Sequence, residues 1–297
     1  MTNVRPNHSI CSHIGRYVEL TKPRLTMVAL ITTLVGFCLG TGKPMNVGLL
    51  IHALMGTALL GAGLAALNQY FERRRDALMP RTAGRPLPSG RMRPKEALAF
   101  GILISIAGLL QLQFAVNPLT AGLATVTLFL YLCCYIPLKG ITPWCTLVGA
   151  VPGALPPVIG YTAASGRIDA GAIVLFAILF LWQMPHFLAI ATVYREQYRD
   201  AGMPMLPVVD PDGTRTARHI VIYSLALLVA TLWPSYVGLS GNAYLMVAVF
   251  LGFIFGAFAF EAAIGRTIQS ARRLFLASVL YLPLLLGVMI WDRLPAS

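Results

Sequence analysis

Charged residues are scarce in this chain of 297 residues: they make up 11%, against a hydrophobic content of 57%. A soluble domain ordinarily carries about 25% charged residues. So few charges cannot cover a surface that faces water, and the mean hydropathy of +0.72 agrees with this. The composition also excludes an intrinsically disordered chain, which would be poor in hydrophobic residues. The sequence therefore predicts a membrane protein.

Cysteine is scarce as well, with five residues and no CxxC pair. Most of these cysteines lie inside apolar segments, where a free cysteine serves as a small hydrophobic side chain. Neither a disulfide framework nor a zinc site is expected.

Long apolar segments fill most of the sequence, and a membrane-spanning helix needs about 20 such residues. They predict an all-α polytopic membrane protein with a cytoplasmic N-terminal segment, residues 1–24, and a single domain of nine transmembrane helices, residues 25–292. No soluble domain fits between the spans. The nine predicted spans are Leu25–Leu39, Val47–Phe71, Ala97–Val116, Leu119–Ile136, Trp144–Ala164, Ala170–Val193, Ile220–Gly238, Ala243–Ala263 and Leu274–Trp291.

The basic residues predict the orientation of these spans. The N-terminal segment and the loops after every second span hold 20 of the 23 Lys and Arg residues, and the other side holds only Lys43, Arg167 and Arg293. Cytoplasmic loops collect Lys and Arg, so the N-terminus is predicted inside and the C-terminus outside. These loops explain the net charge of +12 without nucleic-acid binding. The first 24 residues lack a long apolar stretch, so no cleaved signal peptide is expected and a bacterial inner membrane is predicted.

Acidic residues number only 11, and six of them fall in two predicted cytoplasmic loops. The first loop, Asn68–Arg93, reads NQYFERRRDALMPRTAGRPLPSGRMR. If the second span continues as a helix, Asn68, Glu72 and Asp76 share one face at i, i+4 and i+8, until Pro80 breaks the helix. Carboxylate and amide oxygens are ligands of Mg²⁺, which commonly bridges carboxylates and substrate phosphates. The arginines that follow suit the phosphate oxygens themselves.

The second acidic loop repeats this spacing. Glu196 and Asp200 lie 124 residues after Glu72 and Asp76, which hints at a weak internal repeat of four spans. Two such repeats facing each other would bring both acidic ends together over a central cavity. Lys139, in the short loop between them, is placed to reach a phosphate. Span five is rich in glycine and proline, which indicates an irregular helix with close backbone approach.

Three other interpretations remain at this point. The arginines could anchor the topology, with the acidic residues paired to them. A transporter of small anions or lipids would explain broken helices and a repeat, but its acidic residues would be expected near the bilayer midplane. A structural membrane subunit would leave both acidic loops unexplained.

The chain resembles the UbiA superfamily of intramembrane prenyltransferases and, within it, the protohaem IX farnesyltransferase (haem O synthase) family. The first loop matches the signature N-x-x-x-(D/E)-x-x-x-D-x-x-M-x-R-T-x-x-R-P-L. The runs WQMPHF from Trp182, AGMPMLP from Ala201 and GALPPVIG from Gly153 are also similar to that family. The resemblance covers roughly residues 20–292.

Three positions depart from the family pattern. Gln197 stands where an aspartate is expected in the run from Glu196 to Gly202, Gly140 replaces the second member of a basic pair, and Cys145 replaces an asparagine. An amide oxygen can still ligate a metal but carries no charge, and Asp200 is placed to compensate from one turn away. These changes affect most the metal site expected at the second acidic loop, around Glu196 and Asp200.

The resemblance implies transfer of the farnesyl group of farnesyl diphosphate to a vinyl group of haem B, with addition of water, to give haem O. It implies a UbiA-like cavity, Mg²⁺ as cofactor, haem B as substrate, and a product that feeds terminal oxidases, often through a haem A synthase. A UbiA-type enzyme with an aromatic or quinone-precursor acceptor is the alternative. Asn68, Glu72 and Asp76 are the expected catalytic residues, and Glu72, Asp76, Glu196 and Asp200 the expected metal ligands. The expected substrate-binding residues are Arg81, Arg85, Tyr135, Lys139, His186 and Tyr198.

His186 is the histidine that lies near the end of a span within a family-like motif. It could ligate or orient the haem iron. The alternative is a helix-end histidine that is hydrogen-bonded to the backbone.

Overall fold

The computed structural model describes residues 10–41 and 44–294. Within these ranges nine helices are long and apolar enough to cross a membrane, as predicted. They are α2 (Pro23–Gly40), α3 (Val47–Asp76), α5 (Pro94–Ala115), the continuous segment Pro118–Leu138, α8 (Cys145–Ser165), α9 (Ala170–Val193), the segment Thr214–Tyr236, α14 (Asn242–Gly265) and α15 (Ile268–Trp291).

Two of the spans differ from a simple α-helix. The fourth consists of α6 (Pro118–Phe129), a π-helical segment η1 (Leu130–Tyr135) and the short α7 (Ile136–Leu138). The seventh consists of α12 (Thr214–Ala230) and α13 (Trp233–Tyr236). The seventh begins six residues before its predicted start, because its first turn is polar and hydropathy does not register it. Single π-helical turns inside α-helices are frequent at functional sites.

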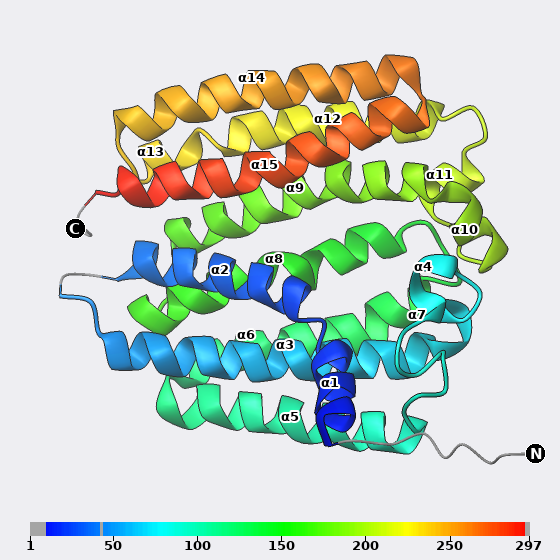
Figure 1. The fold of residues 1–297 in the computed structure, drawn as a ribbon. Coiled ribbons are helices and arrows are strands. Elements are labelled where there is room, and N and C mark those ends of the chain that lie inside the picture. The colour runs from blue at the N-terminus through cyan, green and yellow to red at the C-terminus, as the bar shows by residue number, and fades with distance from the viewer. Residues whose placement is uncertain (1–9, 42–43, 295–297) are drawn as a thin grey trace, which may run out of the picture.

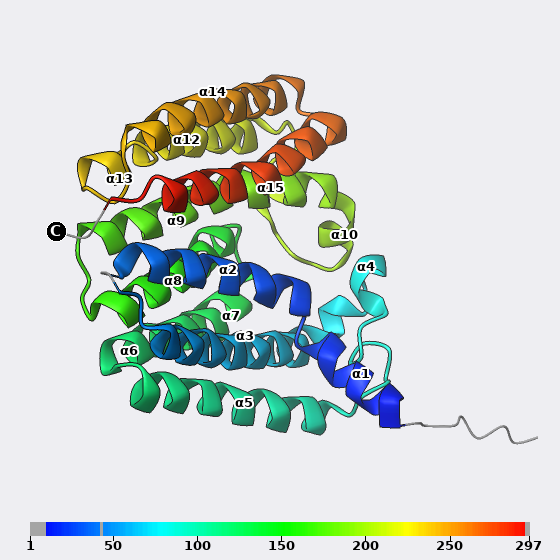
Figure 2. The ribbon, with the colours of Figure 1, turned by 60° about the vertical axis from the view of Figure 1, so that its left-hand side comes forward.

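The remaining helices are short and gather at one end of the bundle. Figure 1 shows α4 (Pro80–Ala83), α10 (Arg195–Asp200) and α11 (Leu206–Val209) at the end opposite to the C-terminus of α15, and Figure 2 shows α1 (Ile10–Leu20) on the same side as α4. This is the end that the basic residues predict to be cytoplasmic. The loops that carry the acidic residues therefore meet on one face.

The long helices form two groups on either side of α8 and α9. Both ribbon views place α12, α14 and α15 on the α9 side, and α2, α3, α5 and α6 on the α8 side (Figures 1 and 2). Of an 18-residue window in α8, 67% is buried, against 28% to 50% in the other spans. α8 is therefore the central helix, packed against both α2 and α9.

Glycines allow α2 and α8 to approach closely. A Cβ atom at Gly160 of α8 would overlap the carbonyl oxygen of Thr33, and one at Gly36 of α2 would overlap that of Pro157. The predicted close backbone approach is confirmed, although α8 stays helical through its three prolines. Small residues give transmembrane helices this kind of contact.

Gly160→Ala is expected to lower the thermal unfolding midpoint in detergent, because the added methyl group must push α2 and α8 apart. Overpacking of this kind costs about 1–3 kcal/mol. Gly256→Ala in α14 is the matched control, since a Cβ at Gly256 meets no atom within 4 Å. An equal midpoint in both variants would contradict this packing.

Candidate active site

The end of α3 presents three polar side chains on one face, as the spacing predicts. Asn68, Glu72 and Asp76 are 2%, 4% and 2% exposed, so all three are buried. α3 ends at Asp76, and Pro80 opens the short helix α4. Buried carboxylates persist only where cations or hydrogen-bond donors compensate them.

Glu72 is compensated by Lys139, which reaches it from the end of the fourth span. The ammonium nitrogen lies 2.8 Å from Oε1 and 3.0 Å from Oε2 of Glu72. The side-chain amide of Asn68 donates a further hydrogen bond of 2.7 Å to Oε2. Burial alone would lower the pKa of Lys139, but Tyr135 and Glu72 raise that pKa well above its usual value. The ammonium therefore stays charged, 4.8 Å from the ring centre of Tyr135.

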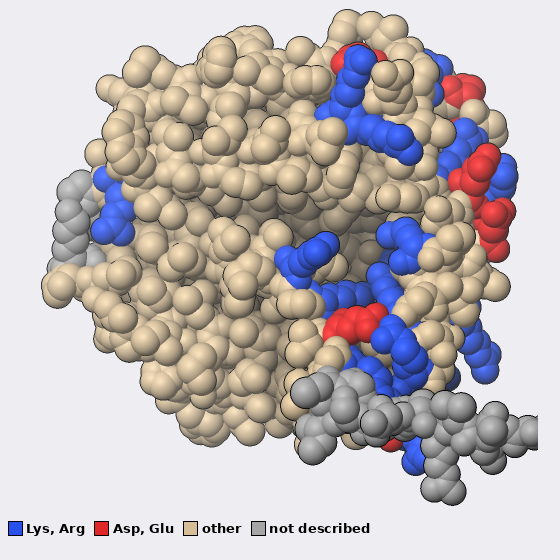
Figure 3. Space-filling model, in the orientation of Figure 1, with Lys and Arg blue, Asp and Glu red and all other residues tan. Residues whose placement is uncertain are grey.

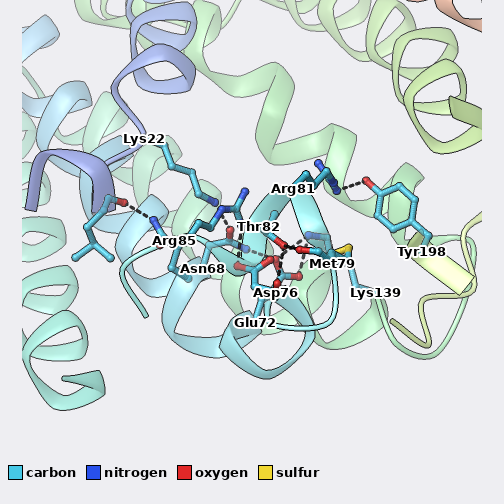
Figure 4. A network of polar contacts seen from close by, with 12 residues as sticks. Lys22, Asn68, Glu72, Asp76, Met79, Arg81, Thr82, Arg85, Lys139 and Tyr198 are labelled. Atoms are coloured by element: carbon cyan, nitrogen blue, oxygen red, sulfur yellow. Dashed lines mark hydrogen bonds and ion pairs between the residues drawn. The ribbon is translucent and has the colours of Figure 1, made fainter. Parts of the chain in front are cut away.

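Asp76 is compensated by the arginine-rich loop that follows it. Nη1 of Arg85 lies 2.7 Å from Oδ2 of Asp76. The hydroxyl of Thr82 donates to the carbonyl oxygen of Asp76 at 2.8 Å, which ties α4 back to the end of α3. Figure 4 shows the side chains of both ion pairs close together.

Lys22 completes a charged cluster. The other members are Asn68, Glu72, Asp76, Arg85 and Lys139, and Lys22 was not among the residues predicted from the sequence. Its ammonium donates a hydrogen bond of 2.6 Å to Oδ1 of Asn68. Burial, reinforced by the positive charges of Arg85 and Lys139, lowers the pKa of Lys22 to about 7. The residue adopts a left-handed backbone with φ of 48°, although Pro23 follows it and such a position favours an extended backbone. The sequence feature that could have singled out Lys22 is its position directly before Pro23, the proline that opens α2.

Arg81 joins the two loops that the sequence predicted to face each other. Its Nη2 donates to the hydroxyl of Tyr198 at 2.8 Å. Its guanidinium carbon also lies 5.1 Å and 5.2 Å from the ring centres of Tyr194 and Tyr198. Arg81 thus connects α4 to α10 across the face of the bundle, as Figure 4 shows.

The structure places Glu196 and Asp200 apart from this cluster. Both side chains are exposed on α10, and Oδ1 of Asp200 lies 3.9 Å from Nε of Arg199. Gln197 points elsewhere, because neighbouring residues on a helix are turned by about 100°. Its Oε1 is buried and has no hydrogen-bond partner among the described residues. On α10 the buried oxygen therefore belongs to Gln197, the position where the family pattern expects an aspartate.

His186 lies in α9, outside the charged cluster. Its Nδ1 is 2.7 Å from the hydroxyl oxygen of Ser278 on α15, and its ring stacks on Trp182 with ring centres 4.8 Å apart. The partner of His186 is therefore a side chain rather than the backbone.

The oxygen atoms at the end of α3 fit Mg²⁺ better than a softer metal. Glu72, Asp76 and Asn68 offer hard oxygen ligands, and Gln197 offers an unpartnered amide oxygen. No third acidic, histidine or cysteine side chain joins Glu72 and Asp76 within the described ranges. Mg²⁺ commonly needs only one or two carboxylates beside substrate phosphates. These residues are suited to a metal ion that arrives with a diphosphate.

Basic side chains surround a hollow beside the cluster. Figure 3 shows this hollow between the strip of surface formed by α15 and the beginning of α2, with Lys and Arg side chains on its rim. The cations that contact the cluster or its loops are Lys22, Arg81, Arg85 and Lys139. Even with Lys22 neutral, the other three cations outnumber the two carboxylates and leave a net positive charge for a polyanionic ligand.

Comparisons with known proteins show which family and which fold this chain is similar to. The model of the UbiA prenyltransferase family matches residues 29–284. A protein named protoheme IX farnesyltransferase from Solibacter usitatus is 50% identical over 286 residues, which cover 93% of this chain and 98% of that protein.

Two solved structures share the fold at low sequence identity. A structure of digeranylgeranylglyceryl phosphate synthase matches with a TM-score of 0.81 and 16% identity, over 94% of this chain and 98% of that one. A UbiA homologue from Archaeoglobus fulgidus bound to GPP and Mg²⁺ matches with a TM-score of 0.69 and 16% identity, over 92% of this chain and 99% of that one.

Proposed function

Because this chain belongs to the UbiA prenyltransferase family, we propose that it transfers the farnesyl group of farnesyl diphosphate to a vinyl group of haem B. The product is haem O, whose side chain also gains a hydroxyl group from water. The observation that carries this proposal is the 50% identity to a protoheme IX farnesyltransferase along nearly the whole of both chains.

The charged cluster is proposed to bind the diphosphate and stabilise its departure. Mg²⁺ held by Glu72, Asp76 and Asn68, with Gln197 as a further oxygen donor, would neutralise charge on the leaving group. Support comes from the buried carboxylates on α3 and from the Mg²⁺ and GPP in the related Archaeoglobus structure. Glu196 and Asp200 are left out of this proposed metal site, because both side chains are exposed on α10.

The basic residues are proposed to contact the departing diphosphate oxygens. Arg81, Arg85, Lys139 and Lys22 offer charge-assisted hydrogen bonds, which are about twice as strong as neutral ones. Donors fixed in advance stabilise the charge that develops on the leaving group without further reorganisation. Tyr135 and Tyr198 hold two of these cations, Lys139 and Arg81, by ring contact and hydrogen bond.

The apolar interior is proposed to protect the farnesyl cation until the vinyl group of haem B attacks it. A site that excludes water prevents hydrolysis of such a reactive species. The haem propionates suit the basic residues at the rim of the hollow, while the macrocycle suits the apolar helices. The attack joins the farnesyl carbon to the outer vinyl carbon and leaves the positive charge on the inner vinyl carbon. One water molecule then adds to that inner carbon and releases a proton to solvent, which leaves the hydroxyl group.

The orientation in the membrane follows from the charge distribution and is also a proposal. The N-terminus and the site face the cytoplasm, and the C-terminus faces the outside of a bacterial inner membrane. Haem O would pass from the enzyme to a terminal oxidase, directly or through a haem A synthase.

The acceptor is tested by incubating the detergent-purified chain with farnesyl diphosphate, Mg²⁺ and either haem B or an aromatic acid acceptor. Mass spectrometry of the products is expected to show haem that carries one farnesyl and one hydroxyl group. Prenylated aromatic acid with unmodified haem would contradict the haem assignment and support the alternative acceptor.

Lys22→Gln is expected to raise the KM for farnesyl diphosphate about 10-fold, because a charged hydrogen bond contributes about 1.5–3 kcal/mol. Steady-state kinetics at varied farnesyl diphosphate measure this change. Lys95→Gln, an exposed lysine at the start of α5, is the matched control and should keep the wild-type KM. Equal KM values in the two variants would remove Lys22 from the site.

A further inference from the structure

A second polar group lies within the apolar part of the bundle, away from the charged cluster. It consists of His186 on α9 and Ser278 on α15, whose Nδ1 and Oγ atoms are 2.7 Å apart. His186 lies seven residues before Val193, the last residue of α9. At 1.5 Å per residue it is therefore about 10 Å from that end of the helix. The diphosphate chemistry proposed above does not use this pair.

The proton of Ser278 determines the direction of the hydrogen bond. The hydroxyl of Ser278 donates to the carbonyl oxygen of Phe275 at 2.6 Å, and a carbonyl oxygen can only accept. With its proton used there, Oγ is the acceptor and Nδ1 of His186 the donor, because this tautomer satisfies both contacts of Ser278.

A neutral imidazole has one protonated and one unprotonated nitrogen. Within residues 10–41 and 44–294 no carboxylate contacts His186, so its environment favours the neutral ring. With the proton on Nδ1, the lone pair is on Nε2, which has no hydrogen-bond partner among the described residues. A half-buried histidine with a free Nε2 is in the state that ligates iron.

Aromatic rings fix the plane of this imidazole. Trp182 stacks on His186 with an interplanar angle of 24°, and the ring of Phe275 lies 5.2 Å from His186 on centres. The indole nitrogen of Trp182 donates to the carbonyl oxygen of Ser278 at 2.9 Å, which ties the stacked ring to α15. Orientation by a hydrogen bond to the second ring nitrogen is typical of metal-binding histidines.

We propose that Ser278 is a positioning residue that holds His186 in the tautomer whose Nε2 lone pair binds the iron of haem B. This inference rests on the proposed haem acceptor and adds the side chain that prepares the iron ligand. Ser278 acts through His186 and touches neither the vinyl group nor the diphosphate. It would set the affinity and pose of the haem, while the binding of farnesyl diphosphate would not depend on it.

The test is a titration of the full-length protein in detergent with ferric haem B, followed by absorption and electron paramagnetic resonance spectroscopy. Wild type is expected to show an imidazole-ligated iron, and His186→Ala is expected to lose that signature. Ser278→Ala should weaken haem binding about 10-fold, because changes in such supporting partners typically cost 10–100-fold in metal affinity. It should raise the KM for haem B and leave the KM for farnesyl diphosphate unchanged.

Two further variants separate the hydroxyl from simple packing. Ser278→Thr keeps a hydroxyl and should restore wild-type haem affinity. Ser224→Ala removes another buried serine hydroxyl, one without a hydrogen-bond partner among the described residues, and should leave haem binding unchanged. Ser278→Thr behaving as poorly as Ser278→Ala, or Ser278→Ala binding haem like wild type, would overturn the inference.

The outcomes also distinguish this inference from the proposed function. Haem farnesylation with an unchanged iron spectrum in His186→Ala would overturn the role of His186 and Ser278 and leave the enzyme assignment intact. Imidazole-ligated haem in a protein that prenylates only another acceptor would support the ligand pair and overturn the haem-farnesylating activity.

Discussion

Asp76→Asn is expected to reduce the rate of haem farnesylation about 1,000-fold, which corresponds to about 4 kcal/mol of lost transition-state stabilisation. The change removes one negative charge from the proposed Mg²⁺ site. It keeps an oxygen that can accept a hydrogen bond from Arg85, whose Nη1 lies 2.7 Å from Oδ2 of Asp76 in the wild type. Because asparagine has nearly the same shape, the folded yield should be preserved. Product formation under saturating farnesyl diphosphate and haem B measures the effect.

Glu261→Gln provides the matched control for this prediction. Oε1 of Glu261 on α14 also pairs with an arginine, lying 2.6 Å from Nη1 of Arg273 on α15, but these side chains are 39% and 53% exposed. The control should retain wild-type turnover. If Asp76→Asn were as active as Glu261→Gln, Asp76 would have no role in binding metal or diphosphate.

Lys139→Met is expected to be the most destabilising single change at the site. It would leave Glu72, 4% exposed, without its cation. Removing one partner of a buried ion pair costs about 3–5 kcal/mol. The thermal unfolding midpoint in detergent should fall clearly, and activity should be lost because the site loses a cation.

The double variant Glu72→Gln with Lys139→Met separates stability from activity. Replacing both charges removes the unpaired carboxylate, so most of the lost stability should return while activity remains absent. Arg273→Met, which breaks the exposed pair with Glu261, should cost no more than about 1 kcal/mol. A double variant as unstable as Lys139→Met would contradict the ion-pair explanation.

The spans could be predicted from the sequence because the bilayer allows few solutions. Each backbone polar group in the membrane must be hydrogen-bonded within the span, so an apolar segment of sufficient length becomes a helix. The bounds of α9, Ala170–Val193, match the prediction. Hydropathy has no signal for the π-helical turn at Leu130–Tyr135 or for the polar first turn of α12, and the prediction missed both.

The site could be predicted only where its residues are close in sequence. The spacing of Asn68, Glu72 and Asp76 follows the helical period, so their shared buried face was predictable. Lys22 and Lys139 lie 46 and 67 residues from their partners, and only the packing of the helices brings them together.

In the second acidic loop, the charge of Glu196 and Asp200 led to the prediction that they bind metal. The rotation of this short helix instead exposes Glu196 and Asp200 and buries the amide oxygen of Gln197. Tyr198 on the same helix accepts a hydrogen bond from Arg81, and a contact between loops so far apart in the sequence is not encoded in the local pattern.

The buried cluster at the end of α3 is proposed to drive farnesyl transfer from the diphosphate to haem B. The most direct measurement follows diphosphate release and haem modification together in the purified wild-type protein with Mg²⁺. One diphosphate is expected to be released for each haem that gains a farnesyl and a hydroxyl group. Diphosphate released at the same rate with and without haem, and with unmodified haem at the end, would contradict it.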